Sequence, residues 1–189
     1  MKKRVGVLIS GAGSNMQSLV ASSRKSESAY EIACVVSNNP DAVGIAWAAE
    51  QGIPTRIIAH QKFLTRQLFD AALNDELQTH HLNLIACAGF MRVMTDVILT
   101  PWAWRMLNIH PSLLPKYTGL NTHQRALDAG DEEAGCSVHW VTAELDAGPV
   151  IAQASVKILA SDTAQTLAAR VLEQEHKLYP EVLQKIAEG

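Results

Sequence analysis

The chain has 189 residues, of which 48% are hydrophobic and 19% charged, and its formal net charge is −3. This composition is typical of a folded globular protein and excludes an intrinsically disordered chain. The charge gives no basic excess for nucleic acid, and no apolar run approaches the roughly 20 residues that a membrane helix needs. We therefore expect no nucleic-acid partner, no membrane anchor and a single domain over residues 1–189.

The three cysteines are Cys34, Cys87 and Cys136. Their number is odd, and no Cys-x-x-Cys pair occurs among them. This pattern favours free thiols in a reducing cytoplasm over disulfides or a zinc site.

The first half of the chain alternates short apolar segments with longer segments of helical period. Strands are predicted over residues 4–10, 32–38 and 82–89, and helices over residues 14–24, 42–51 and 65–80. This alternation is typical of βαβ units, which place parallel strands in one sheet. The first and third strands carry few polar residues, as strands covered on both faces do.

The second half of the chain has a different pattern. A strand is predicted over residues 105–110, a short helix from His123 to Gly130, and two strands within 135–158 joined by "AELDAG". A long amphipathic helix follows from Asp162. The sequence thus predicts a doubly wound α/β fold with a mainly parallel sheet, an antiparallel strand pair in the C-terminal half and a long C-terminal helix.

The first strand ends in a glycine turn, "SGAGSN", that opens the first helix. Gly11 and Gly13 permit a tight turn, and Ser14 and Asn15 start a helix whose free N–H groups and dipole favour an anion. Met16 stands where a dinucleotide fingerprint has its third glycine, so a phosphate monoester or a mononucleotide fits better than NAD. The alternative is a plain strand-to-helix turn with Ser14 as the N-cap.

A second candidate site lies in "LNIHPSLLPKYTGL", residues 107–120. Alternate residues of a strand face the same side, so Asn108 and His110 should project together while Ile109 enters the core. The amide can donate to an oxyanion and the imidazole can move protons, which suits attack on a carbonyl-type carbon. Asp146 is the best candidate for orienting His110, and Glu144 and Asp128 are the alternatives. A structural His and Asn at a strand end remain possible, and no His-x-x-x-His pattern indicates a metal.

Five segments together resemble the phosphoribosylglycinamide formyltransferases, also called GAR transformylases, of the formyl-tetrahydrofolate transferase superfamily. They are "LISGAGSNMQSL", "AGFMRVM", "LNIHPSLLPKYTGL", "GCSVHWVTAELDAGPVI" and "EQEHKLYP". The resemblance implies formyl transfer from 10-formyltetrahydrofolate to glycinamide ribonucleotide in purine biosynthesis, by a monomer or a homodimer without a metal. It also implies a phosphate-binding half in residues 1–100 and a catalytic and folate-binding half in residues 101–189.

The resemblance assigns roles to individual residues. Asn108, His110 and Asp146 match the catalytic trio, in which Asn108 holds the oxyanion, His110 assists proton transfer and Asp146 orients and charges His110. The residues that match the ribonucleotide site are Gly11, Ala12, Gly13, Ser14, Asn15 and Glu175. The residues that match the folate pocket, beside Asn108, are Arg66, Met91, Arg92, Val93, Met94, Thr142, Ala143, Glu144, Leu145 and Asp146.

Three other functions compete with this expectation. A formyltetrahydrofolate hydrolase and an aminoacyl-tRNA formyltransferase share the trio but usually carry a further domain, and neither extension is seen in this sequence. A nucleotide- or folate-binding module without catalysis is the alternative from a different class, and the intact trio counts against it.

Overall fold

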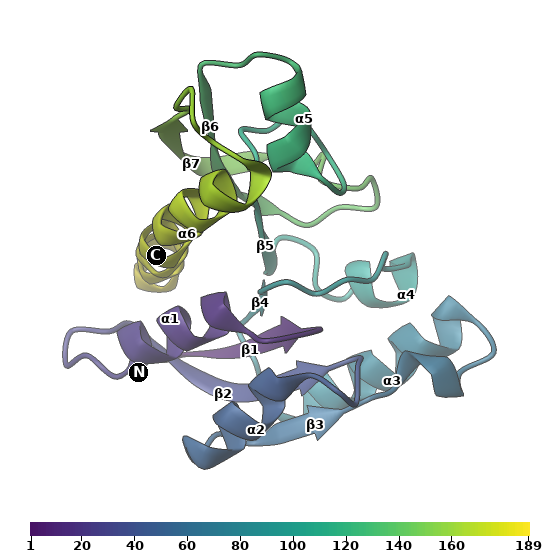
Figure 1. Cartoon of the computed structure of the whole chain (residues 1–189). Helices are drawn as coiled ribbons and strands as arrows, with labels where there is room; N and C mark the ends of the chain where they lie inside the picture. The colour runs from purple at the N-terminus through teal and green to yellow at the C-terminus, as the bar shows by residue number, and fades with distance from the viewer.

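The computed structural model describes all 189 residues and contains one seven-stranded mixed sheet with helices on both faces (Figure 1). The strands are β1 (Lys3–Ile9), β2 (Tyr30–Ser37), β3 (Thr55–Ile57), β4 (Leu84–Cys87), β5 (Met106–His110), β6 (Glu133–Trp140) and β7 (Val150–Lys157). The helices are α1 (Ser14–Ser23), α2 (Val43–Glu50), α3 (Arg66–Thr79), α4 (Asp96–Leu99), α5 (Thr122–Asp128) and α6 (Ala164–Glu188), with one 3₁₀ turn, η1 (His60–Lys62).

The strand order across the sheet is β3-β2-β1-β4-β5-β6-β7. Strands β1 to β5 pair in parallel, whereas β6 runs antiparallel to β5 and β7 runs antiparallel to β6. The predicted fold, a mainly parallel sheet with an antiparallel pair in the C-terminal half, is confirmed.

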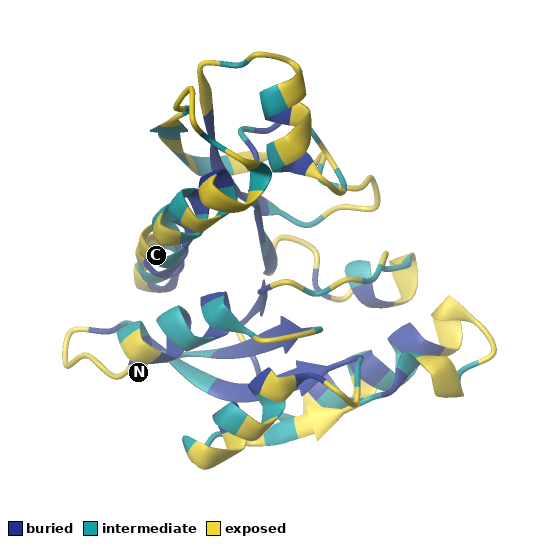
Figure 2. Cartoon of the chain, in the orientation of Figure 1, coloured by how far each residue is buried: buried dark blue, intermediate teal, exposed yellow.

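The two faces of the sheet carry two separate hydrophobic clusters. Val7 and Ile9 of β1 pack in the larger cluster, which α1, α2, α5 and α6 cover. Leu8, between them in sequence, packs in the other cluster against α3 and α4. This period of two is the strand alternation expected for a sheet buried on both faces, and the central strands are accordingly buried (Figure 2).

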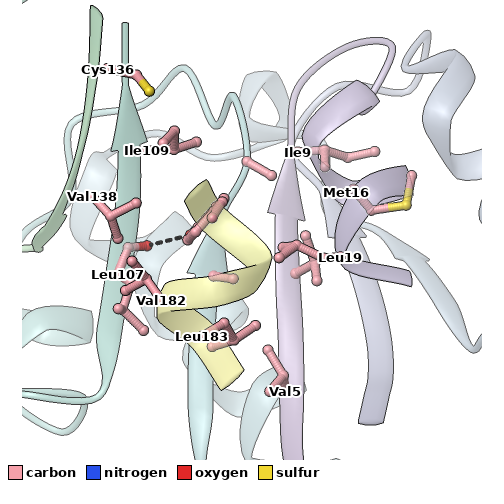
Figure 3. Packing of buried hydrophobic residues seen from close by; sticks show 14 of the residues in the cluster. Val5, Ile9, Met16, Leu19, Leu107, Ile109, Cys136, Val138, Val182 and Leu183 are labelled. Atoms are coloured by element: carbon pink, nitrogen blue, oxygen red, sulfur yellow. Dashed lines mark hydrogen bonds between the residues drawn. The ribbon is translucent and has the colours of Figure 1, made fainter. Parts of the chain in front are cut away.

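Helix α6 packs across the sheet and contacts both its parallel and its antiparallel strands. It begins with a capping box at Thr163, and its buried stripe includes Leu167, Val171 and Leu183. Figure 3 shows Val182 and Leu183 among core side chains of β1, β5 and β6. The hydroxyl of Tyr179 donates to the carbonyl oxygens of Cys87 and Leu107, at 3.1 and 3.2 Å, and so joins α6 to β4 and β5. Not even this helix is long and apolar enough to cross a membrane.

Three short elements are absent from the sequence-based expectation. They are β3, η1 and α4, of three, three and four residues. Segments this short contain too few residues to display a period of 2 or 3.6, so their pattern does not separate them from loops. The bounds of the expected elements differ from the observed ones by one or two residues, because a sequence pattern does not mark the exact residue at which a helix or strand ends.

The topology creates a switch point between β1 and β4. From β1 the chain moves outward to β2 and β3, and then returns to β4 on the other side of β1. At such a point the loops after the two strands diverge, and α/β proteins bind ligands in the crevice they leave. Here the loops in question are the glycine turn after β1 and residues 88–95 after β4.

Candidate active site

The pair Asn108 and His110 lies at the end of β5, beside this switch point. Leu107 and Ile109 face the larger hydrophobic cluster, and Met106 belongs to the opposite one. Because successive strand residues face opposite sides, Asn108 and His110 lie on the side of the sheet that Met106 faces. His110 is 6% exposed and Asn108 is half-buried. The prediction that both polar groups project together is confirmed, and Ile109 is in the core as expected.

Asp146 is the carboxylate that approaches His110. Its Oδ2 lies 3.4 Å from His110 Nδ1 and accepts a hydrogen bond from the Gly119 N–H at 2.8 Å. The residue has a φ of 53°, a left-handed conformation that turns the β6–β7 loop toward the end of β5. Neither alternative pairs with His110: Glu144 is exposed, and Asp128 accepts a hydrogen bond from Gln124.

The second ring nitrogen of His110 has a backbone partner. Nε2 lies 2.9 Å from the carbonyl oxygen of Tyr117, which can only accept, so Nε2 carries a proton. Nδ1 is then the nitrogen that exchanges its proton, and it faces the Asp146 carboxylate. This arrangement suits a group that donates and takes back one proton at Nδ1.

His139 is part of the same cluster, although no pattern in the sequence singles it out. The antiparallel register places it opposite Asn108, whose Nδ2 lies 3.1 Å from His139 Nε2. Its Nδ1 lies 3.0 Å from the Trp140 carbonyl oxygen and carries the proton, so Nε2 accepts from Asn108. Burial lowers the pKa of His139, which agrees with a neutral ring. The signal that could have identified it is the cross-strand pairing of two predicted strands.

The glycine turn joins β1 to α1 without a side-chain cap. Gly13, not Ser14, is the N-cap residue, with a left-handed φ of 72°. The expected role of Ser14 as the N-cap is therefore wrong. Gly11, Ala12 and Ser14 are exposed or half-buried, so the N-terminal end of α1 is open to a ligand. A helix N-terminus that no side chain caps retains unpaired N–H groups that suit an anion.

Asn15 and Glu175 connect this turn to α6. Asn15 Nδ2 donates to Glu175 Oε2 at 2.6 Å, and the two side chains are 8% and 7% exposed. Burial raises the pKa of Glu175, while the bond from Asn15 and the nearby His110 oppose that rise. The carboxylate on the apolar stripe thus has the buried partner that its position calls for, and Asn15 Oδ1 has no hydrogen-bond partner.

A cleft of about 90 Å³ lies beside Asn108, between the loops that follow β4 and β6. Of the residues predicted for the folate pocket, it is lined by Arg92, Val93, Met94, Asn108, Thr142, Ala143, Glu144, Leu145 and Asp146. Met91 and Arg66 are exposed and do not line it. The cleft is also lined by four residues that the sequence did not identify: Cys87, Phe90, His139 and Val141. No group of three or more His, Cys, Asp or Glu side chains is placed to hold a metal ion.

Residues 3–183 match the family model described as formyl transferase. The Escherichia coli phosphoribosylglycinamide formyltransferase is 44% identical over 183 residues, which are 97% of this chain and 86% of that protein. The trifunctional purine biosynthetic protein adenosine-3 of Bos taurus is also 44% identical over 188 residues, but these are 19% of its length. The chain thus spans a fifth or less of the trifunctional relatives that it matches.

Solved structures agree with these matches. The phosphoribosylglycinamide formyltransferase of Brucella melitensis superposes with a TM-score of 0.96 at 46% identity, covering 100% of this chain and 97% of that one. The glycinamide ribonucleotide transformylase 1 of Symbiobacterium toebii has a TM-score of 0.97 at 41% identity, covering 100% and 89%.

Proposed function

This chain belongs to the formyl transferase family, and on that premise we propose that it transfers a formyl group from 10-formyltetrahydrofolate to the amine of N1-(5-phosphoribosyl)glycinamide. The relatives named for this activity are similar over nearly the whole chain. The observation that carries the proposal is the approach of Asp146 to His110 beside Asn108, at the mouth of a cleft lined by the predicted folate residues.

The proposed reaction begins when the amine of the ribonucleotide attacks the formyl carbon. The carbonyl oxygen becomes an oxyanion, and Asn108 is placed to donate to it. One amide hydrogen is bound to His139 Nε2, which fixes the orientation of the amide and leaves the second hydrogen for the oxyanion. Because this geometry exists before substrate arrives, it needs no reorganisation during the reaction.

The proposed second step is collapse of the tetrahedral intermediate. N10 of the folate leaves as an amine and needs a proton, while the attacking amine must lose one. His110 Nδ1 donates its proton to N10, and the Asp146 carboxylate stabilises the imidazolium before that transfer. The neutral Nδ1 then takes up the proton that the attacking amine loses, which restores the imidazolium. The two proton transfers balance, so the products are the formylated ribonucleotide and tetrahydrofolate, and the enzyme is regenerated.

The ribonucleotide is proposed to bind with its phosphate at the N-terminus of α1 and its sugar near Glu175. The open turn and the buried Asn15–Glu175 pair, which spans β1–α1 and α6, support this placement. We also propose a division into a phosphate-binding half, residues 1–100, which contains the glycine turn, and a catalytic and folate-binding half, residues 101–189, which contains Asn108, His110 and Asp146. We also propose a cytoplasmic location, which the three free, buried cysteines support.

The test is a formyl-transfer assay with purified protein, 10-formyltetrahydrofolate and the ribonucleotide, and a parallel reaction without the ribonucleotide. Product that forms only with both substrates supports the transferase. Release of formate without the ribonucleotide would indicate a hydrolase, and binding of both ligands without any reaction would indicate a binding module.

A further inference from the structure

We propose that Asp70, a residue of α3 outside the catalytic cluster, is a positioning residue for the folate co-substrate. It holds the far end of residues 90–95, called here the 90–95 loop, which forms one wall of the cleft. The inference rests on the function proposed above, because that function assigns 10-formyltetrahydrofolate to the cleft.

Asp70 is a buried carboxylate with an unusual set of partners. It is 1% exposed, and no Lys, Arg or His side chain forms an ion pair with it. Its Oδ2 accepts from the Thr95 N–H at 2.6 Å and from the Thr95 hydroxyl at 2.7 Å, while Oδ1 has no partner. Burying a charge is costly unless it is well bonded, so both bonds that offset this cost go to one residue of the loop.

The role of Thr95 supports the same conclusion. Thr95 is the N-cap residue of α4, yet its side chain makes no capping bond to that helix. An N-cap threonine ordinarily accepts from an N–H of the first turn. Here the hydroxyl is turned to Asp70 instead, so Thr95 is tied to α3 across the loop.

The 90–95 loop has few other constraints. Residues 90–94 make no backbone–backbone hydrogen bond. The near end is held by Ser10, whose hydroxyl oxygen accepts from the Met91 N–H at 2.7 Å. Between the two ends, the Arg92 guanidinium lies 5.7 Å from the centre of the Phe69 ring, next to Asp70 in α3. Because Arg92, Val93 and Met94 lie between Ser10 and Asp70, the wall of the cleft depends on both attachments.

The experiment compares Asp70→Ala, Asp70→Asn and the control Asp75→Ala, an exposed residue of the same helix. Asp70→Ala removes both bonds and should raise KM for 10-formyltetrahydrofolate by about tenfold, with KM for the ribonucleotide within about twofold of wild type. Asp70→Asn should avoid most of this rise in KM, because its amide oxygen can still accept from Thr95. Thr95→Val, which loses only the hydroxyl, and Thr95→Ser, which keeps it, provide the test if Asp70→Ala does not fold.

Two further measurements separate this inference from the proposed function. Hydrogen exchange of the amides of residues 90–95 should become faster in Asp70→Ala and Thr95→Val but not in Asp75→Ala, whatever the reaction. Calorimetric titration with tetrahydrofolate should show the same loss of affinity without turnover. Unchanged exchange, or equal increases in both KM values, would overturn the inference while wild-type formyl transfer stands. Wild-type protein that binds no folate would overturn both.

Discussion

At the scale of single residues, the proposed roles of His110 and His139 depend on which ring nitrogen of each carries a proton. His110 Nε2 and His139 Nδ1 each face a backbone carbonyl oxygen, at 2.9 and 3.0 Å, so those nitrogens are protonated. The other nitrogen of each ring therefore faces a side chain of the site, and the two nitrogens differ in role. His110 Nδ1 lies beside a carboxylate and suits proton exchange, whereas His139 Nε2 accepts from the Asn108 amide.

His139→Phe should lower kcat by about tenfold or more and leave both KM values nearly unchanged, because the Asn108 amide loses its orienting acceptor in the transition state. His139→Gln should recover part of the loss, since its side-chain oxygen can accept from Asn108. Steady-state kinetics of the two variants, with Asn108→Ala as the reference for complete loss of the donor, provides the check. A kcat of His139→Phe equal to that of wild type would show that the orientation of the amide does not depend on His139.

The sequence predicted the geometry of Asn108 and His110 because both lie on one strand, where alternation alone fixes their direction. It proposed Asp146 as the partner of His110, with two open alternatives, because a loop residue 36 positions away has no local pattern to place it. His139 was missed for a related reason. Its approach to Asn108 depends on the register between β5 and β6, which neither strand shows by itself.

At the scale of elements, the glycine turn is shaped by the helix packed against it. Gly44, in the first turn of α2, donates its N–H to the Gly11 carbonyl oxygen at 3.1 Å. A Cβ at Gly44 would lie 2.9 Å from the Ala12 carbonyl oxygen and 3.0 Å from that of Gly11. The absence of a side chain at Gly44 thus lets α2 support the turn directly.

Gly44→Ala should destabilise the protein, although alanine ordinarily stabilises a helix by about 1 kcal/mol relative to glycine. The new methyl group must push away the backbone of the turn, at a cost of roughly 1–3 kcal/mol, and KM for the ribonucleotide should rise. Urea denaturation measures the stability. Gly11→Ala is the control for folding, because its Cβ would meet nothing within 4 Å. A Gly44→Ala variant more stable than wild type would contradict the proposed support of the turn.

Ser14→Asp tests the phosphate site at the start of α1. A carboxylate in the first turn interacts favourably with the helix dipole, by about 0.3–1 kcal/mol, so the variant should be at least as stable as wild type. Its charge should repel the phosphate and raise KM for the ribonucleotide by about tenfold. Ser14→Asn has a similar shape without the charge and should bind nearly normally. Equal KM values for the two variants would place the phosphate elsewhere.

The elements that the sequence predicted well are the long ones. Helices α1, α3 and α6 have enough turns to show an apolar stripe, and β1 and β4 are apolar runs between turns. Strand β3 has three residues, two of them exposed, and it exists because β2 offers an edge to pair with. Such an element is stabilised by tertiary pairing, which a local pattern does not contain.

At the scale of the whole molecule, the proposed active site is assembled from segments far apart in the chain. The turn after β1, the 90–95 loop after β4, the end of β5 and the loop after β6 meet at the carboxyl ends of the parallel strands. Helix α6 contributes Glu175 from the opposite end of the chain and is bonded through Tyr179 to both β4 and β5. The stability of the fold and the geometry of the site therefore depend on the same buried polar contacts.

Unfolding free energy should fall as the pH drops below about 6.5, before most carboxylates titrate. Burial lowers the pKa values of His123, His139 and His176 from 6.5, so the unfolded chain takes up protons near pH 6.5 that the native chain does not. A fully buried histidine costs at most about 1.4 kcal/mol per pH unit, and the part-exposed His123 and His176 cost less. The raised pKa of Glu175 acts in the opposite direction at lower pH.

Urea denaturation at pH 7.5, 6.5 and 5.5 measures this dependence. The double variant His123→Gln/His176→Gln should lose less stability between pH 6.5 and 5.5 than wild type. In a further measurement at pH 4.5, the Glu175→Gln variant should lose more stability than wild type, because the opposing group is absent. Parallel curves for all three proteins would refute the assignment of the acid sensitivity to these groups.

The central claim is that Asn108, His110 and Asp146 carry out formyl transfer between two bound substrates. A single-turnover experiment tests it most directly: excess enzyme is mixed with both substrates, quenched at intervals and assayed for the formylated ribonucleotide. Wild-type protein should form product, and His110→Ala should bind both substrates, as calorimetry would show, yet form product at least about a hundredfold more slowly. Product formation by His110→Ala at the wild-type rate would contradict the claim.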